Sequence, residues 1–178
     1  MKQLVAPWRM AFIKKARSGH ECIFCKYQRK AQRKRARKNL LLYFGEHCFI
    51  MMNRYPYNNG HLMVAPYVHS GEISKFKPAV HEELMRLTGL SVKILKKALG
   101  CGGANCGINV GHVAGAGIAG HIHMHVVPRW LGDSNFFPVI ADTKSMPEYL
   151  EETYDRLKPY FEKMVNPSPR RTPGSRAR

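Results

Sequence analysis

Residues 121–127 read His-Ile-His-Met-His-Val-Val, so three histidines alternate with apolar side chains. In a β-strand, successive side chains point to opposite faces of the sheet. A strand over 121–127 would therefore carry three imidazoles on one face and send Ile122, Met124 and Val126 into a core on the other. Proline lacks the N–H that a strand ladder uses, so Pro128 is expected to end this strand.

The imidazole face predicts chemistry on phosphorus. A neutral imidazole is a good nucleophile, and neighbouring imidazoles can orient it, donate protons and stabilise developing charge. The preceding loop 111–120 is rich in glycine, whose backbone can approach a phosphate closely. We therefore predict a nucleotide-processing enzyme in which the middle histidine, His123, attacks a phosphate ester or anhydride. A hydrogen-bonded structural cluster of histidines is the alternative interpretation.

The elements around this stretch predict an α+β domain. Apolar residues recur at helical spacing over 79–99, with Pro78 in the first turn and Gly100 at the stop, which predicts a long helix. A second apolar stripe predicts a C-terminal helix over 147–164. Short apolar runs predict strands over 40–44, 49–53, 61–65 and 106–110. Strands grouped around one long helix favour a mainly antiparallel sheet.

The composition fits one folded domain. Of the 178 residues, 44% are apolar and 23% are charged, which suits a globular domain with a real core. We assign 1–165 to that domain and 166–178, rich in Pro, Arg and Ser, to a disordered basic tail. No apolar run reaches the ~18 residues of a membrane span, and the start lacks a secretory-signal pattern. The expected compartment is therefore the cytoplasm.

The formal charge of +17 comes from two segments. The run Lys26–Lys38 contains eight basic residues and no acid, and the tail adds four arginines. Without these twelve, 17 basic residues stand against 12 acidic ones, so the rest of the domain is ordinary. A basic run is either a solvated face or a contact for a polyanion such as nucleic acid. Its aromatic residues are not interleaved with the basic ones, which does not favour base stacking.

The pattern His-φ-His-φ-His-φ-φ, with φ apolar, resembles the signature of the histidine triad (HIT) superfamily, and 121–127 match it at every position. The resemblance implies a single HIT-like α+β domain, with a mainly antiparallel sheet, one long helix and a C-terminal helix. It also implies a homodimer. The flanking matches are similar to diadenosine tetraphosphate phosphorylases and fragile-histidine-triad hydrolases. These matches are APWR at 6–9, CIFC at 22–25, Asn53, GHLMV at 60–64, NVG at 109–111 and PRW at 128–130.

The resemblance also implies a role for each site residue. His123 would attack the α-phosphorus and carry the nucleotidyl group. His125 and His61 would bind phosphate and assist the leaving group. Asn53 would contact the ribose, and Asn109 would contact phosphate.

The chain departs from relatives before the triad. Hydrolases of this group often have a Ser or Thr there, but residues 114–120 contain no hydroxyl. Backbone N–H groups, such as that of Gly117, would then contact the nucleotide phosphates. Water as the acceptor makes a hydrolase and inorganic phosphate makes a phosphorylase, and the sequence leaves both open. Uridylyltransferase-like relatives carry Gln at the position of His125, which disfavours hexose-1-phosphate transfer here.

Cys22 and Cys25 form a C-x-x-C pair, which needs two more ligands to hold tetrahedral zinc. The resemblance implies that His69 and His121 complete a structural zinc site, with no cofactor required for the chemistry. Two reduced cysteines without metal are the alternative, and His20 and His47 are competing ligands. A different class of function is a zinc-stabilised nucleic-acid-binding protein that uses Lys26–Lys38 and binds less tightly in salt.

Overall fold

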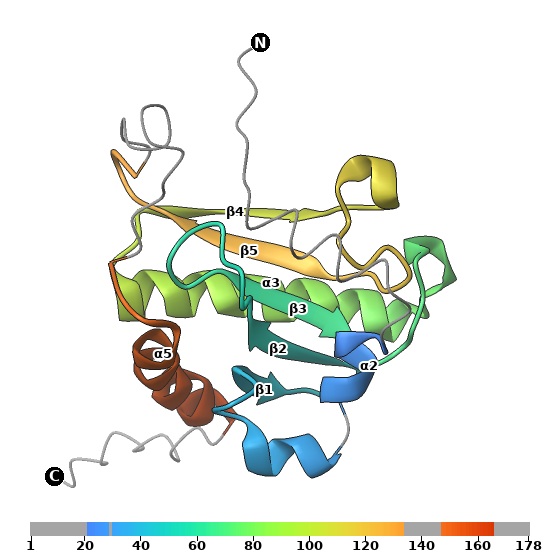
Figure 1. Ribbon diagram of the computed structural model, residues 1–178, viewed down its shortest axis with the longest axis horizontal. Coiled ribbons are helices and arrows are strands. Elements are labelled where there is room, and N and C mark those ends of the chain that lie inside the picture. Colours follow the sequence, from blue (N-terminus) through green and yellow to red (C-terminus); the bar gives the residue numbers. More distant parts are fainter. Residues whose placement is uncertain (1–20, 29, 134–146, 166–178) are drawn as a thin grey trace, which may run out of the picture.

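A five-stranded antiparallel sheet in the order β1-β2-β3-β5-β4 forms the centre of the computed structural model (Figure 1). The structure describes residues 21–28, 30–133 and 147–165. The strands are β1 Leu41–Phe44, β2 Cys48–Met52, β3 Leu62–Pro66, β4 Gly103–Ile108 and β5 Met124–Arg129. The helices are α2 Ile23–Tyr27, α3 Pro78–Leu99 and α5 Leu150–Val165, with 3₁₀ turns η1 Lys30–Arg35, η2 Ile73–Lys75 and η3 His112–Ala114. This confirms the predicted α+β class with a mainly antiparallel sheet.

The two faces of the sheet are covered differently. One face packs against α3 and α5 in a large apolar cluster that includes Ile122, Met124 and Val126. The other face carries a smaller cluster built around Phe24 of α2 and Met63 of β3. The alternation over 121–127 therefore has the predicted effect, since its apolar residues enter the α3 core and its histidines face α2.

The long helix forms where the sequence predicts it. Helix α3 begins at Pro78, whose missing N–H costs nothing in the first turn. It ends at Gly100, which adopts the left-handed conformation with φ of 66° and closes the helix through its N–H to the Lys96 carbonyl. Its buried side chains recur at helical spacing and fill the core: Val80, Leu84, Leu87, Ile94 and Leu95.

The predicted strand over 121–127 is wrong at both ends. Residues 121 and 122 bond to loops instead of a neighbouring strand. The His121 N–H donates to the Ile118 carbonyl at 3.2 Å, and the Ile122 N–H donates to the Ser70 carbonyl at 2.8 Å. Regular pairing starts at Met124 and continues through Pro128 to Arg129. Pro128 is tolerated because it lies beyond the last residue pair between β3 and β5 and faces only β4.

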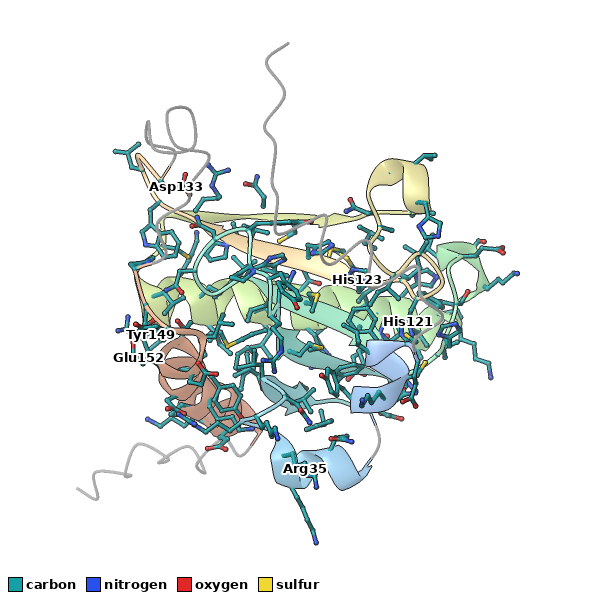
Figure 2. All side chains as sticks on the ribbon, in the orientation of Figure 1. Arg35, His121, His123, Asp133, Tyr149 and Glu152 are labelled. Atoms are coloured by element: carbon teal, nitrogen blue, oxygen red, sulfur yellow. The ribbon has the colours of Figure 1, made fainter. Side chains whose placement is uncertain are left out.

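Two other predicted boundaries also need correction. Strand β4 begins at Gly103 rather than Cys106, because Gly103 pairs with the extended end of β5. Helix α5 begins at Leu150 rather than Pro147. The Tyr149 carbonyl accepts the first helical bond, from Thr153, while the Glu152 carboxylate caps the Tyr149 N–H at 3.3 Å (Figure 2).

Several expectations fall outside what the structure describes. The basic tail 166–178 and the matching stretch 6–9 belong to the undescribed segments, so the boundaries 1–165 and 166–178 stay predictions. Within the described parts of the chain, no helix combines the length and apolar character that crossing a bilayer requires.

Glu83 of α3 ties the β1–β2 turn to the helix. Its buried carboxylate accepts the backbone N–H groups of Glu46, His47 and Cys48 and pairs with Arg86 at 2.7 Å. Burial raises the pKa of this carboxyl, but the three N–H donors and the Arg86 guanidinium together lower it below its ordinary value. The ionised form is therefore the one that the fold stabilises.

We expect Glu83→Gln to lower the free energy of unfolding by about 1–3 kcal/mol at pH 7, because an amide N–H₂ would face backbone donors. The pKa of the Glu83 carboxyl is lower in the folded state than in the unfolded state, where it is about 4.3. The ionised carboxylate therefore stabilises the folded state above that pH, and this stabilisation is lost as the pH falls below it. The gap between wild type and variant should thus shrink in urea unfolding below about pH 4. Glu82→Gln, at an exposed neighbouring position, is the control. A gap that is constant with pH would contradict this assignment.

Candidate active site and metal centre

The histidine face of the sheet lies beside α2, away from α3. Figure 2 shows His121 and His123 close to the short helix, and the Phe24 ring centroid lies 5.0 and 4.7 Å from theirs. His125 lies on β5 opposite Met63, which belongs to the same α2-side cluster. The His123 and His125 rings meet edge to face, with centroids 4.7 Å apart. The alternation thus brings two neighbouring imidazoles together and places the third beside the cysteines of α2.

Hydrogen bonds assign the tautomers of His61 and His125. The backbone N–H of Tyr57 donates to His61 Nδ1 at 3.1 Å, so the proton of neutral His61 lies on Nε2. His61 Nε2 lies 2.9 Å from His125 Nδ1 and donates to it. The proton of neutral His125 then lies on its own Nε2. These two hydrogen bonds leave His125 with its N–H donor on the edge of the ring remote from His61.

His123 is held in the complementary tautomer. Its Nδ1 donates to the carbonyl of His121 at 2.9 Å, which leaves Nε2 with a lone pair. Burial lowers the pKa of His123, so the imidazole is neutral at pH 7. A neutral ring with a lone pair on the outer nitrogen is the nucleophilic form.

His61 is fully buried, and its two ring nitrogens face Tyr57 and His125. This geometry lets it orient His125. Its predicted direct contact with phosphate stays a prediction.

A braced turn presents His61. Gly60 has φ of 75°, and a Cβ there would lie 2.4 Å from the Leu99 side chain, so this position requires glycine. The buried Thr153 hydroxyl of α5 donates to the Asn59 side-chain oxygen at 3.0 Å. Asn58 donates to the Pro128 carbonyl at 3.0 Å. The turn is thus fixed to both α5 and β5.

Of the three residues predicted to contact nucleotide, Asn53 contacts one of these histidines, and the nucleotide contacts of all three stay predictions. Asn53 follows β2, and its Nδ2 lies 3.3 Å from His61 Nδ1. Asn109 follows β4 directly, one residue beyond the Ile108–Met124 pair. Gly117 is half-buried in the turn that leads from η3 to His121.

Sequence reasoning missed Tyr57. Its ring stacks on His61 with centroids 4.7 Å apart, and its N–H fixes the tautomer. The only available signal was an aromatic residue four positions before His61, within a segment that otherwise indicates a turn.

The structure gathers Cys22, Cys25, His69 and His121 from three separate segments, with all four ligand atoms within 4.8 Å of one another. The sulfur–nitrogen separations are 3.4 Å for Cys22–His121, 3.2 Å for Cys25–His69 and 3.6 Å for Cys25–His121. The two Nδ1 atoms lie 3.2 Å apart. The close loop approach needs Gly71, where a Cβ would lie 2.5 Å from the Ala119 carbonyl oxygen.

This donor set fits a tetrahedral zinc ion. Zinc–sulfur bonds of about 2.3 Å and zinc–nitrogen bonds of about 2.05 Å give sulfur–nitrogen edges of about 3.5 Å and a nitrogen–nitrogen edge of about 3.4 Å. His121 Nε2 donates to the Pro66 carbonyl at 2.9 Å, which leaves Nδ1 as the free ligand atom. Burial also lowers the pKa of His121 to about 4, so the ring is neutral. Four protein ligands close such a site, as in structural zinc centres.

Solved structures share this fold. A Zn-bound histidine triad family protein from Mycobacterium smegmatis aligns with a TM-score of 0.64 at 22% identity, over 84% of this chain and 97% of that one. A histidine triad nucleotide-binding protein from Sulfolobus tokodaii aligns with a TM-score of 0.64 at 23% identity, over 86% and 100%.

Sequence comparison points the same way. AP-4-A phosphorylase of Mycobacterium tuberculosis is 39% identical over 116 residues, which is 65% of this chain but only 60% of that protein. An uncharacterised HIT-like protein of Methanocaldococcus jannaschii is 35% identical over 96 residues, covering 52% of this chain and 70% of that protein. The HIT domain family matches residues 34–130, more than half of the chain. With the histidine pattern, the sheet and these matches in agreement, the chain belongs to the histidine triad (HIT) family.

Proposed function

We propose that the chain cleaves dinucleoside polyphosphates, such as diadenosine tetraphosphate, through a nucleotidyl-histidine intermediate on His123. The observation that carries the proposal is the tautomer of His123, whose Nδ1–H is held by the His121 carbonyl so that Nε2 keeps its lone pair. The 39% sequence identity over 116 residues to a protein named AP-4-A phosphorylase supports this class of substrate.

The first step is attack by His123 Nε2 on the α-phosphorus. A phosphorus–nitrogen bond forms and the bond to the bridging oxygen breaks. The leaving nucleotide departs as a phosphate anion, and the Nε2–H of neutral His125 donates a hydrogen bond that stabilises its charge. In the second step, phosphate or water attacks the same phosphorus, the phosphorus–nitrogen bond breaks, and the proton of the attacking group passes to solvent. The lone pair of His123 Nε2 is then restored.

Three other residues would hold the nucleotide. The Asn53 amide uses one N–H toward His61 and accepts the Tyr55 N–H at 2.9 Å, so one donor and one lone pair remain for a ribose hydroxyl. Asn109, one residue beyond the Ile108–Met124 pair, and the backbone N–H of Gly117 would contact phosphate oxygens.

Product analysis tests this function. The purified chain would be incubated with diadenosine tetraphosphate, with and without inorganic phosphate, and the nucleotides resolved by ion-exchange chromatography. ADP and ATP formed only with phosphate identify a phosphorylase, and AMP and ATP identify a hydrolase. No cleavage in either condition, by protein containing its metal, would overturn the proposed substrate class.

The buried His61 yields a separate prediction. We expect His61→Leu to lower kcat by about 10²-fold with little change in KM, because His125 loses its orienting donor without losing substrate contacts. The acidic limb of the plot of kcat against pH should also shift. A purely structural defect would lower kcat but leave the position of that limb unchanged. Steady-state kinetics between pH 5 and 9 measure both effects. An unaltered pH profile would argue against the hydrogen bonds that link Tyr57, His61 and His125 and fix their tautomers.

We also propose that Cys22, Cys25, His69 and His121 hold a structural Zn²⁺ ion. Four of the six separations between the ligand atoms, at 3.2–3.6 Å, and the hydrogen bond from His121 Nε2 support this identity. A zinc-bound protein with the same fold adds support. Zinc here would pin α2 against the sheet and leave the reacting histidines to do the chemistry.

A homodimer through β4 is proposed from the exposed edge of the sheet. Among the described strands, β4 pairs only with β5; it contains neither charge nor proline and carries exposed Cys106. Such an edge is a ready template for pairing with a second copy. We expect Cys106→Arg to shift the chain from dimer to monomer in sedimentation velocity, whereas exposed Met85→Arg on α3 should not. A wild-type monomer at 100 μM would exclude this dimer.

A further inference from the structure

The basic run that the catalytic site does not use lines an open cavity of about 770 Å³ at the β1 edge of the molecule. Its walls carry five basic side chains and the ring of Tyr27, and Glu151 is the carboxylate among the described lining residues. Figure 2 labels Arg35 on η1, below β1, at this edge. The basic side chains are Lys34, Arg35, Arg37, Lys38 and Arg54.

Two of the arginines are fixed in place. Arg37 makes a two-pronged ion pair with Asp155 of α5, at 2.8 and 2.7 Å. Arg54, which comes from the loop after β2, donates to the Lys38 carbonyl at 2.8 Å. These bonds hold η1, the β2–β3 loop and α5 together around the cavity, so the basic groups are presented on a fixed frame.

Three further cations line the cavity. Lys34, Arg35 and Lys38 are exposed, and none of the ion pairs between described residues involves them. Arg37 is balanced by Asp155, so the cavity has an excess of positive charge over Glu151. Such a concave basic surface attracts phosphates.

A short loop connects this cavity with the catalytic histidines. Arg54 directly follows Asn53, and the next aromatic residues are Tyr55, 43% exposed, and Tyr57, 37% exposed and stacked on His61. Two strand spacings, about 10 Å, separate the β1 edge from β3. An exposed ring, that of Tyr55, thus directly follows a cation of the cavity wall, Arg54, along this loop.

We propose that this surface binds single-stranded nucleic acid, with backbone phosphates in the basic cavity and bases against Tyr27 and Tyr55. Cations spread along a groove match the repeated phosphates of a strand, whereas a single phosphate would need only one convergent pocket. The half-buried ring of Tyr27 and the exposed ring of Tyr55 add the stacking that polynucleotides offer and inorganic polyphosphate lacks. This binding does not depend on nucleophilic attack by His123.

The test is fluorescence anisotropy of a labelled 12-nucleotide single strand titrated with the full chain. We expect the variant Lys34→Ala/Arg35→Ala/Lys38→Ala to weaken binding at least tenfold at 0.1 M salt. The slope of log Kd against log salt should fall by about 2, because three phosphate contacts are lost. A charge-matched control, Lys77→Ala/Lys93→Ala/Lys96→Ala on the exposed side of α3, should stay within twofold of wild type.

Stacking and catalysis are separated by two more variants. Tyr55→Ala should weaken strand binding about fivefold while its affinity for inorganic polyphosphate stays unchanged. His123→Asn should bind the strand as wild type does, even if the proposed catalytic function proves wrong. The proposal would be overturned by equal losses of strand affinity in the two triple variants or by unchanged strand affinity in Tyr55→Ala. Binding of inorganic polyphosphate as tight as that of the single strand would also overturn it.

Discussion

Replacing His123 with Asn should abolish cleavage of diadenosine tetraphosphate, with a loss in kcat of at least about 10³-fold. An Asn side chain can still donate to the His121 carbonyl, which His123 Nδ1 contacts at 2.9 Å, so the local fold is retained. It has no nitrogen lone pair that can attack phosphorus, so the covalent route is lost. Initial-rate assays on wild type and variant measure the effect.

Two controls give this result its meaning. Radiolabelled substrate should leave an acid-labile label on wild-type protein and none on the variant, since a phosphorus–nitrogen bond is acid-labile. His112→Asn, at an exposed position of η3, should retain full turnover. Turnover by His123→Asn within tenfold of wild type would refute nucleophilic attack by this residue.

The second large effect concerns the metal. We expect purified chain to contain about one zinc ion and Cys25→Ser to contain almost none, because a tetrahedral site with three good ligands binds zinc far more weakly. The variant should lose several kcal/mol of unfolding free energy, since the metal binds the folded form and links α2 to two loops. Atomic emission measures the zinc, and thermal unfolding with and without a chelator measures stability.

Cys106→Ser is the matched control, because this cysteine lies on β4 outside the ligand set. It should keep both its zinc and its stability. A wild-type chain free of zinc after growth in zinc-replete medium, with melting unaffected by chelator, would contradict the proposed site.

Local sequence patterns predicted the elements that depend on local physics. Period-two alternation identified the histidine face, and helical spacing between Pro78 and Gly100 identified α3 almost to the residue. Strand ends were predicted less well, because they depend on partners. Met124 begins β5 only because Ser70 and Ile118 bond the preceding residues, and Gly103 begins β4 only because β5 extends past Pro128.

Long-range contacts could not be predicted in this way. Nothing near Tyr57 in the sequence reveals that its N–H fixes the His61 tautomer. The bond between Thr153 and Asn59 spans 94 positions, so neither residue alone indicates a braced turn. The basic cavity could not be predicted for the same reason. Arg54 lines it together with the basic run, although strands β1 and β2 separate the two in the sequence.

The unequal covering of the two sheet faces has a consequence for how the molecule opens. On the α3 side, a continuous apolar cluster must be exposed all at once, so that layer should exchange its amide hydrogens only on global unfolding. On the α2 side, the short helix is held against the sheet by the packing of its own Phe24 and by the four clustered ligand atoms. Stripping those ligands should release α2 as a separate cooperative unit, exposing the catalytic layer to solvent exchange and protease while the rest stays folded.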